Sequence, residues 1–351
     1  MDLRAACTDQ AAACARLGSP FTAGLLRLAA ERLRPGGAVA DRLLGWKGAL
    51  GAGGQSVPLR LAGALHGLVL SGAASGLAAL YPPEDPDPDG LWAEIEAAFT
   101  THEAQLMRWL DSPPQTNEVR RSAVLIAAGH WLTAATGLPL VLSEIGASAG
   151  LNLNWDRYAL DLPEGSYGPA DARLRLAPDW QGPVPPQATP RVIDRRGVDL
   201  NPIEGSTPEG ALRLRAYLWP DQPDRRRLTD AALAEPPAPV DREDALPWLA
   251  RRLADPSPGA LHMIFHTVAW QYLPEEARAE GDRLIAEAGA RATETAPLAR
   301  VEMEADGGDG AALRITLWPG GPPRTVGRAD FHGRWVRWTA AETPDDREGR
   351  I

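Results

Sequence analysis

Residues 140–150 read LVLSEI-GASAG, a short apolar run that leads directly into a segment of small residues. A run of this length and composition is typical of a strand buried on both faces of a sheet. Residues 151–158 are able to continue as a helix. A strand, a small-residue loop and a helix together form the unit that opens a parallel nucleotide-binding sheet. We therefore expect an α/β domain built around this loop.

The chain changes texture just before this stretch. Residues 1–136 carry apolar side chains at three- to four-residue spacing, which predicts an all-α N-terminal domain. Residues 137–351 alternate apolar runs with helical patterns, which predicts a Rossmann-like α/β domain with an insertion at 159–190, where Pro and Gly are frequent. Its expected strands are 140–145, 192–200, 238–240, 261–268, 299–303, 311–318 and 331–338, the last two paired as a hairpin.

Composition bounds the classes of partner. The 351 residues suffice for two domains, and the formal net charge of −10 argues against a general nucleic-acid binder. The start of the chain lacks a signal-peptide pattern, and no apolar run approaches 18 residues, so we expect a cytoplasmic protein that does not enter a membrane. No spacing of His, Cys or acidic residues suggests a metal site, and we predict none. The oligomeric state is not set by these features.

The loop carries the functional argument. A parallel strand that ends in small residues exposes backbone N–H groups, and glycine lets a ligand approach the backbone closely. An acid at the end of the strand, here Glu144, is able to accept hydrogen bonds from a charged or hydroxylated ligand. The loop is therefore predicted to bind a small molecule.

This pattern of acid, glycine and small residues resembles the loop of class I S-adenosylmethionine-dependent methyltransferases, and the resemblance covers residues 137–340. It implies S-adenosylmethionine as cofactor, held by residues of the loop and by the acids that follow the next two strands. The implied cofactor-binding residues are Glu144, Gly146, Ala147, Ser148, Gly150, Asp199 and Asp244. The sequence departs from the family pattern in having Ser148 at the middle glycine and about 50 residues between the loop and Asp199, where about 20 is usual in a dinucleotide-binding unit.

Residues 262–273 resemble the fourth strand of these enzymes and the turn where their chemistry takes place. His266 is the candidate acid or base, with a structural histidine as the alternative. Trp270 or Tyr272 is a candidate wall of the substrate pocket, with a place in the core as the alternative.

Two arginines stand at the start of the helix that precedes the loop. Arg120 or Arg121 is a candidate partner for an anionic group of the substrate. The alternative is a capped helix start with surface ion pairs.

Two other interpretations of the loop remain open. Its letters also fit the Gly-x-Ser-x-Gly nucleophile elbow, in which Ser148 would be the nucleophile of a hydrolase. An acid such as Asp199 or Asp244 would then orient His266 or His332. Two features argue against a hydrolase. About 136 helical residues precede the strand, and Glu144 would have no role in such an enzyme. In the third interpretation the glycines serve only close packing of the loop on its neighbours.

The whole chain also resembles one uncharacterised bacterial family of unknown function, a resemblance that names no reaction. The segments that carry it are 116–122 (TNEVRRS), 146–152 (GASAGLN), 219–222 (WPDQ), 270–273 (WQYL), 318–321 (WPGG) and 332–335 (HGRW). Taken together, the residues favour an S-adenosylmethionine-binding protein, a methyltransferase that acts on a small molecule or a protein. The alternative is a ligand-sensing or interaction protein on the same fold that performs no turnover.

Overall fold

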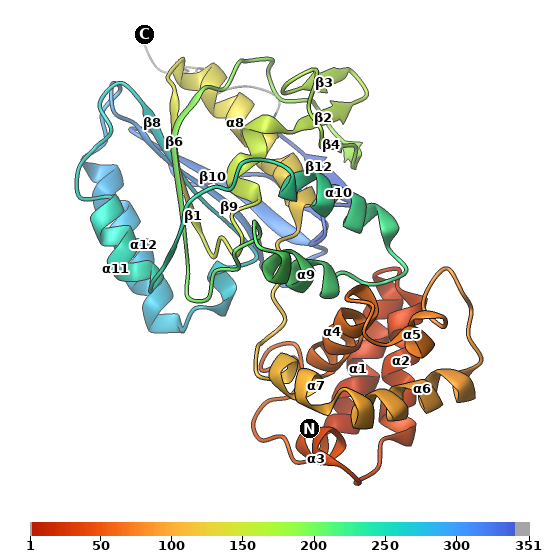
Figure 1. Cartoon of the computed structure of the whole chain (residues 1–351). Coiled ribbons are helices and arrows are strands. Elements are labelled where there is room, and N and C mark those ends of the chain that lie inside the picture. Colours follow the sequence, from red (N-terminus) through yellow and green to blue (C-terminus); the bar gives the residue numbers. More distant parts are fainter. Residues whose placement is uncertain (1, 341–351) are drawn as a thin grey trace. The chain divides into compact units, whose positions relative to one another are not determined.

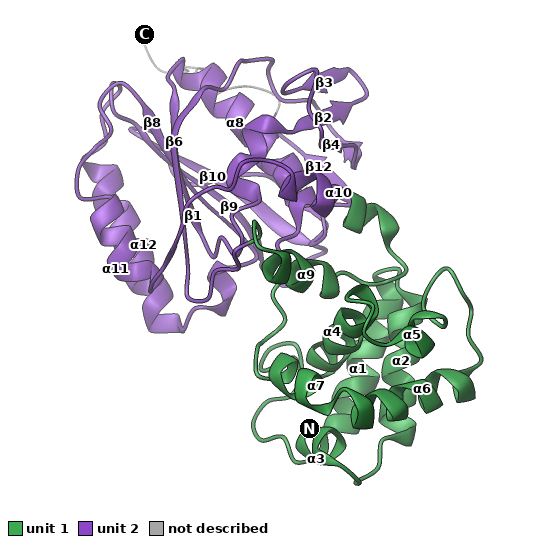
Figure 2. Ribbon diagram, viewed as in Figure 1, with its two compact units in different colours: residues 1–116, 205–227 green, residues 117–204, 228–351 purple. Residues whose placement is uncertain are grey.

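The computed structural model describes residues 2–340 and divides into two compact units (Figures 1 and 2). The first comprises residues 1–116 and 205–227, and the second comprises 117–204 and 228–351. The boundary expected after residue 136 thus lies twenty residues earlier, so the helix in front of the loop belongs with the sheet. After residue 204 the chain returns from the second unit to the first, and after residue 227 it enters the second unit again.

The first unit is helical, as the spacing of its apolar residues predicts. Its helices are α1 (Leu3–Arg16), α2 (Pro20–Arg32), α3 (Ala38–Leu44), α4 (Val57–Leu70), α5 (Ser75–Ala78), α6 (Pro88–Thr101), α7 (Glu103–Leu110) and α9 (Pro208–Ala216). Helix α2 begins at a serine cap, because Ser19 Oγ accepts a hydrogen bond from the backbone N–H of Thr22. Apolar side chains of α1, α2 and α4 are buried in one core. Within residues 2–340, no helix is both long and apolar enough to cross a bilayer.

The returning segment 205–227 is fastened to the first unit by polar contacts. Asp221 accepts hydrogen bonds from the hydroxyl of Ser19 at 2.5 Å and from the backbone N–H of Phe21 at 2.9 Å. Gln222 donates to the carbonyl of Leu17 at 3.0 Å. These two residues belong to the WPDQ segment, so that segment ties a distant part of the chain to the start of α2.

The second unit is built on a nine-stranded sheet with the order β5-β12-β11-β10-β9-β8-β1-β6-β7. Its strands are β1 (Leu140–Ile145), β5 (Asp179–Gln181), β6 (Val192–Asp199), β7 (Val240–Arg242), β8 (Leu261–Thr267), β9 (Leu298–Ala305), β10 (Ala311–Trp318), β11 (Arg324–Ala329) and β12 (Trp335–Trp338). The five strands from β7 to β9 are parallel, and β1 lies at their centre with all six residues buried. This confirms an α/β unit with a largely parallel sheet.

Helices cover the parallel part of the sheet. Helices α11 (Ala245–Arg252) and α12 (Glu275–Ala290) lie together on one face, and α8 (Ser122–Thr136) lies on the other (Figure 1). Short 3-10 helices precede α8 (η1, Val119–Arg121) and follow β8 (η3, Trp270–Tyr272). Helix α10 (Pro223–Leu233) crosses the boundary between the residue ranges of the two units.

The segment between β1 and β6 differs from the expected strand–helix unit. A 3-10 helix, η2 (Asn152–Arg157), stands where a longer helix was predicted for 151–158. The predicted insertion follows as a small sheet of β2 (Ala159–Leu162), β3 (Gly165–Tyr167) and β4 (Arg175–Leu176), after which β5 joins the edge of the main sheet.

The C-terminal strands are antiparallel, but the expected hairpin pairs differently. Strand β10 pairs with β11, which the sequence pattern did not reveal, and β12 then pairs with β11. The predicted strand at 331–338 is shortened to its last four residues, because 330–334 form a turn in which the Asp330 carboxylate accepts backbone hydrogen bonds from His332 and Arg334.

A glycine allows η2 to approach α8. A Cβ atom added at Gly129 would stand 2.1 Å from a ring carbon of Trp155, far inside van der Waals contact. Trp155 is 1% exposed, so its indole has little room to move away. The absence of a side chain at Gly129 therefore sets the distance between the helix and the segment after the loop.

We predict that Gly129→Ala destabilises the second unit by about 1–3 kcal/mol, because an extra methyl group overpacks this contact. Gly24→Ala in α2 is the matched control, since a Cβ there meets no atom within 4 Å. That variant should be neutral or gain about 0.5–1 kcal/mol from helix propensity. Differential scanning calorimetry measures both, and equal effects of the two variants would contradict the proposed contact.

Candidate functional site

The acid at the end of β1 is buried without a hydrogen-bond partner for one of its oxygens. Glu144 is 2% exposed, and its Oε2 atom accepts no hydrogen bond from any described residue. Burial raises the pKa of this carboxyl well above 4.5, the negative charge of Asp199 raises it further, and Arg121 opposes both effects. An ionised carboxylate buried without a donor is costly, which is why burial favours the protonated form of this carboxyl.

The backbone of the loop is not open, contrary to the expectation from its composition. The N–H groups of Gly146 and Ala147 both donate to the carbonyl of Val198, at 2.9 and 3.0 Å. The N–H of Ser148 donates to the carboxylate of Asp199 at 2.9 Å, and the N–H of Gly150 donates to the carbonyl of Ala147 at 2.7 Å. These N–H groups are therefore hydrogen-bonded within the protein and are not available to bind a ligand.

The remaining amides of the loop are bound by Asn117, which the sequence did not single out for this role. Its Oδ1 atom accepts hydrogen bonds from the N–H of Ala149 at 3.2 Å and of Leu151 at 2.9 Å. Five residues on, Ser122 Oγ donates to Oδ1 of Asn152 at 2.7 Å. The TNEVRRS and GASAGLN segments thus form one hydrogen-bonded unit.

Close packing explains part of the small-residue pattern. Gly146 has φ of 70°, in the left-handed region that favours glycine. A Cβ atom there would lie 2.5 Å from the Cβ of Ala269, in the turn after β8. The loop therefore packs against the end of the neighbouring strand, as the third interpretation of its glycines predicts.

Asp199 is the last residue of β6 and Asp244 comes two residues after β7, the two strands beside β1 on one side. Besides Ser148, Asp199 accepts a hydrogen bond from the N–H of Asn201 at 2.8 Å. Asp244 is exposed and caps α11 by accepting from the N–H of Leu246 at 2.9 Å. The carboxyl ends of parallel strands share one edge of a sheet, so Glu144, Asp199 and Asp244 lie at or just beyond the carboxyl ends of three adjacent strands.

His266 lies on the opposite face of the sheet from Glu144. The register pairs Glu144 with Phe265, and side chains alternate between faces along a strand. His266 is fully buried, with Nδ1 2.8 Å from the Glu304 carboxylate, while Arg300 donates to Nε2 at 3.1 Å. Because arginine only donates, Nε2 accepts and the proton is on Nδ1. Both nitrogens are occupied, so this geometry gives His266 a structural role and not that of a base.

The turn after β8 is held by the same carboxylate. Glu304 accepts hydrogen bonds from the N–H groups of Ala269 and Trp270, at 3.0 and 3.1 Å. Hydrogen bonds from His266 and from these amides lower the pKa of Glu304 below its usual value against the opposing effect of burial. Trp270 stacks on His266 with ring centroids 4.8 Å apart, so it belongs to the core. Tyr272 is 67% exposed and remains the candidate wall of a pocket.

Arg121 connects two elements near Glu144. Its guanidinium donates to the carbonyl of Thr267 at the end of β8, at 2.8 Å, and to the carbonyl of Phe331 at 2.9 Å. Arg120 donates through its backbone N–H to the carboxylate of Glu118 at 3.2 Å. Arg121 is thus the arginine whose charge acts at the candidate site.

Ser148 lacks the neighbour that a nucleophile requires. Its φ of 54° is unusual for a residue with a side chain, as in a nucleophile elbow. Its Oγ atom, however, is buried and has no hydrogen-bond partner among residues 2–340, so no described base is within reach of it. With His266 bound to Glu304 and Arg300, the triad required by the hydrolase interpretation is not assembled around His266.

We predict that Asn117→Ala destabilises the second unit by about 1–3 kcal/mol, because two buried amides lose their acceptor. Asn117→Asp keeps an oxygen at that position and should lose less than half as much. Hydrogen exchange at the amides of Ala149 and Leu151 should accelerate only in the alanine variant. Unchanged exchange at both amides would contradict the assigned role.

We further predict that Glu144→Gln stabilises the protein at pH 8. A carboxyl whose folded pKa is raised contributes stability that is complete below its unfolded pKa and is lost as the pH rises through the folded value. Wild-type stability relative to the variant should therefore fall between pH 5 and pH 8 in urea unfolding. A difference that does not change with pH would show that Glu144 titrates normally.

Comparison with known families assigns the chain to one of them. Residues 4–338 match the family described as "uncharacterized protein conserved in bacteria (DUF2332)", so the chain belongs to that family. Neither a curated protein nor a solved structure matches the chain.

Proposed function

We propose that this member of the DUF2332 family binds S-adenosylmethionine at the carboxyl edge of its parallel strands, with Glu144 as the anchor. The observation that carries the proposal is the buried Oε2 atom of Glu144, which has no partner at the end of the central strand. In open α/β sheets, ligands bind outside the carboxyl ends of the strands. The α-ammonium group of S-adenosylmethionine would supply the donor that Oε2 lacks.

The arrangement of strands and acids supports this ligand. In the parallel order β7-β6-β1-β8-β9, acids lie at or just beyond the carboxyl ends of three adjacent strands: Glu144 in β1, Asp199 at the end of β6 and Asp244 after β7. The resemblance to class I methyltransferases implies the same three positions for the amino acid, ribose and adenine parts of the cofactor. Asp199 accepts hydrogen bonds from the N–H groups of Ser148 and Asn201, which hold its carboxylate at the end of β6.

The occupied loop amides also discriminate between cofactors. A dinucleotide or nucleoside triphosphate needs free N–H groups for its phosphates. Here the N–H groups from Gly146 to Leu151 already donate to Val198, Asp199, Asn117 and Ala147. S-adenosylmethionine carries no phosphate, and its ammonium and sulfonium groups are positively charged, so side-chain acids suit these two groups.

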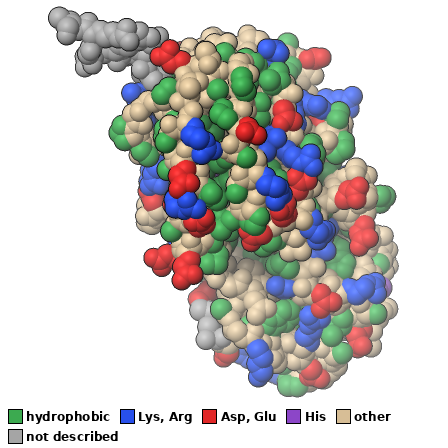
Figure 3. Space-filling view, turned by 90° about the vertical axis from the view of Figure 1, so that its left-hand side faces the viewer, with side chains coloured by type: hydrophobic (Ala, Val, Ile, Leu, Met, Phe, Trp, Pro, Cys, Tyr) green, Lys and Arg blue, Asp and Glu red, His purple; other side chains and the backbone are tan. Residues whose placement is uncertain are grey.

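Methyl transfer is the reaction that this cofactor supports. A lone pair of the acceptor attacks the methyl carbon while the carbon–sulfur bond breaks, and the thioether leaves with that electron pair. The protein contributes mainly position and exclusion of water. Positively and negatively charged side chains are interspersed over the face in Figure 3, a surface that suits a small-molecule or protein acceptor better than bulk nucleic acid.

A sensor without turnover is the second candidate, and one observation favours it. His266 is hydrogen-bonded at both ring nitrogens. Glu304 holds the turn after β8, which resembles the turn where class I methyltransferases carry out their chemistry. An acceptor that must lose a proton would therefore need a base other than His266. Binding without transfer is consistent with this arrangement.

We predict that S-adenosylmethionine and its demethylated product raise the melting temperature of the protein. At 100 times the dissociation constant, a single site stabilises the folded state by about 2.7 kcal/mol. Glu144→Gln should abolish the shift, while Ser148→Ala should retain it. NAD and ATP should give no shift, because the loop offers no free amide to their phosphates.

The outcomes separate the alternatives. A shift with NAD or ATP but not with S-adenosylmethionine would overturn the assignment of the ligand. Labelling of Ser148 by an active-serine probe would restore the hydrolase interpretation. A shift that persists in Glu144→Gln would remove Glu144 as the anchor.

A further inference from the structure

A cavity of about 920 Å³ lies within the first unit, at the upper end of the range typical of small-molecule sites. Three segments line it: residues 20–32, which are α2, residues 82–91, and residues 220–223. All three belong to the first unit. The cavity therefore shares no residue with the glycine loop or with the strands of the sheet.

Prolines and polar contacts hold the lining of this cavity in place. Residues 82–88 and 220–223 contribute six prolines to it, and the ring of each proline fixes its φ angle. Asp89 forms an ion pair with Arg32 of α2 at 2.7 Å, which ties the first segment to the helix. Asp221 accepts a hydrogen bond from the N–H of Phe21 at 2.9 Å, which ties the second. The cavity is thus preformed, which lowers the entropic cost of binding a ligand.

Helix α2 contributes an apolar lining with an open position in it. Leu25 and Leu28 are buried, Phe21 is half-buried, and all three line the cavity. Gly24 also lines it, and a Cβ atom added there would meet no atom within 4 Å. The apolar part of a ligand is able to occupy the space that this glycine leaves, with burial of apolar surface as the driving force.

Carboxylates outnumber guanidinium groups around the cavity. Four acids and two arginines line it, and one of these arginines, Arg32, is already paired with Asp89. Glu31, Glu84 and Asp85 are exposed, and within residues 2–340 none of their carboxylates forms an ion pair. The one remaining arginine does not balance three carboxylates. The surroundings of the cavity are therefore negative and attract a cation.

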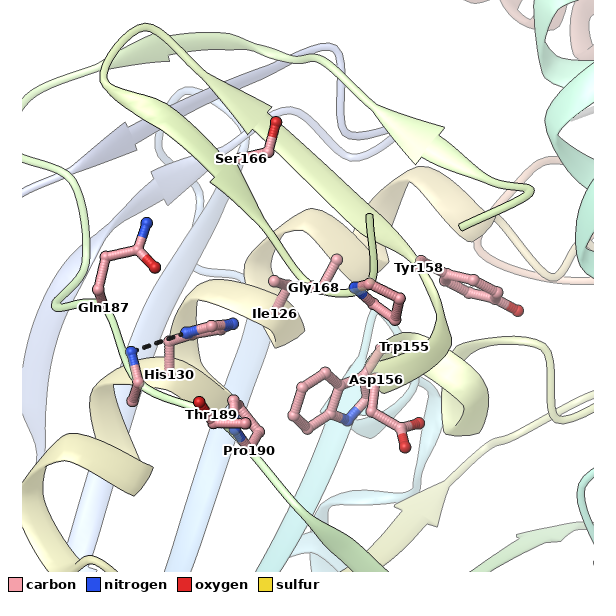
Figure 4. A pocket seen from close by; sticks show the side chains of 12 residues that line it. Ile126, His130, Trp155, Asp156, Tyr158, Ser166, Gly168, Gln187, Thr189 and Pro190 are labelled. Carbon is pink, nitrogen blue, oxygen red and sulfur yellow. Dashed lines mark hydrogen bonds between the residues drawn. The ribbon is translucent and has the colours of Figure 1, made fainter. Parts of the chain in front are cut away.

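A cavity in the second unit differs in both size and charge (Figure 4). Its volume is about 360 Å³, and Asp156 is the one carboxylate among the described residues that line it. That carboxylate accepts hydrogen bonds from the guanidinium of Arg195 at 2.7 and 2.9 Å, so its charge is compensated. Carboxylates without ion pairs therefore distinguish the cavity of the first unit.

We propose that the cavity of the first unit binds a small organic cation with an apolar body, of the alkylammonium or arylammonium class. The apolar body lies along α2 beside Gly24, and the positive group lies near Glu84 and Asp85. The proposal goes beyond S-adenosylmethionine binding, because it uses no residue at the carboxyl edge of the sheet. Failure of one site in its test therefore leaves the other site unaffected.

Isothermal titration calorimetry of the full chain at low ionic strength tests this proposal with octyltrimethylammonium, kept below its micelle concentration. Octyl sulfate is the control, because it carries the same alkyl chain and the opposite charge. The cation should bind at one saturable site at least about tenfold more tightly than the anion, and added salt should weaken its binding. The proposal is overturned if the cation shows no saturable binding or if the anion binds as tightly.

A pair of glycine variants locates the apolar part of the ligand. Gly24→Leu fills the space beside α2 and should abolish binding of the cation, while the free space around its Cβ allows the helix to fold. Gly53→Leu adds the same side chain at a turn outside the lining, where a Cβ also meets no atom within 4 Å, and should leave the affinity unchanged. Wild-type affinity in Gly24→Leu would exclude this cavity as the site.

A pair of double variants tests the charges. Glu84→Gln combined with Asp85→Asn should weaken binding of the cation by about three- to thirtyfold, the range expected when two exposed charge contacts are lost. Glu96→Gln combined with Glu103→Gln removes two exposed acids outside the lining and should keep the wild-type affinity. Equal affinities of the two double variants would show that the carboxylates at the cavity do not select the ligand.

Discussion

The hydrogen bonds that Asn117 accepts from the loop backbone are the contact on which the second unit depends. One amide oxygen takes the N–H groups of Ala149 and Leu151, and so joins the start of α8 to the end of β1. Without such an acceptor, two donors would be buried unpaired beyond the carboxyl end of the central strand. The contact also occupies two N–H groups of the loop, which are therefore not available to a ligand phosphate.

Because the N–H groups of the loop are hydrogen-bonded within the protein, the ligand that we propose would be bound by side chains and not by the backbone. Among residues 2–340, neither Glu144 Oε2 nor Ser148 Oγ has a hydrogen-bond partner, and both atoms are buried. An ionised carboxylate oxygen accepts and a hydroxyl does either, so the ligand that we propose meets these atoms with a donor. That requirement agrees with an ammonium or hydroxyl group and disagrees with a phosphate, although glycine loops of this composition are often associated with phosphates.

The sequence predicted helices and strands better than it predicted the long-range contacts between them. The strand at 140–145 was predicted correctly, because an apolar run followed by glycine is a local signal. The role of Asn117 was missed because its contacts lie 32 and 34 residues away. Strand β11, with the sequence RTVGRA, was missed because it lacks an apolar alternation. The return of 205–227 to the helical unit depends on Asp221, whose partners lie about 200 residues earlier.

The pairing register explains why His266 was a misleading candidate. A histidine at the end of a strand beside the loop is attractive when only the order of residues is known. In the sheet, however, Phe265 is the residue level with Glu144, so a shift of one position sends His266 to the face covered by α12. There Arg300 binds its Nε2 and is itself held by Asp282 of α12 at 2.7 Å. Period-two alternation therefore separates the acid that faces the candidate site from the histidine that stabilises the opposite layer.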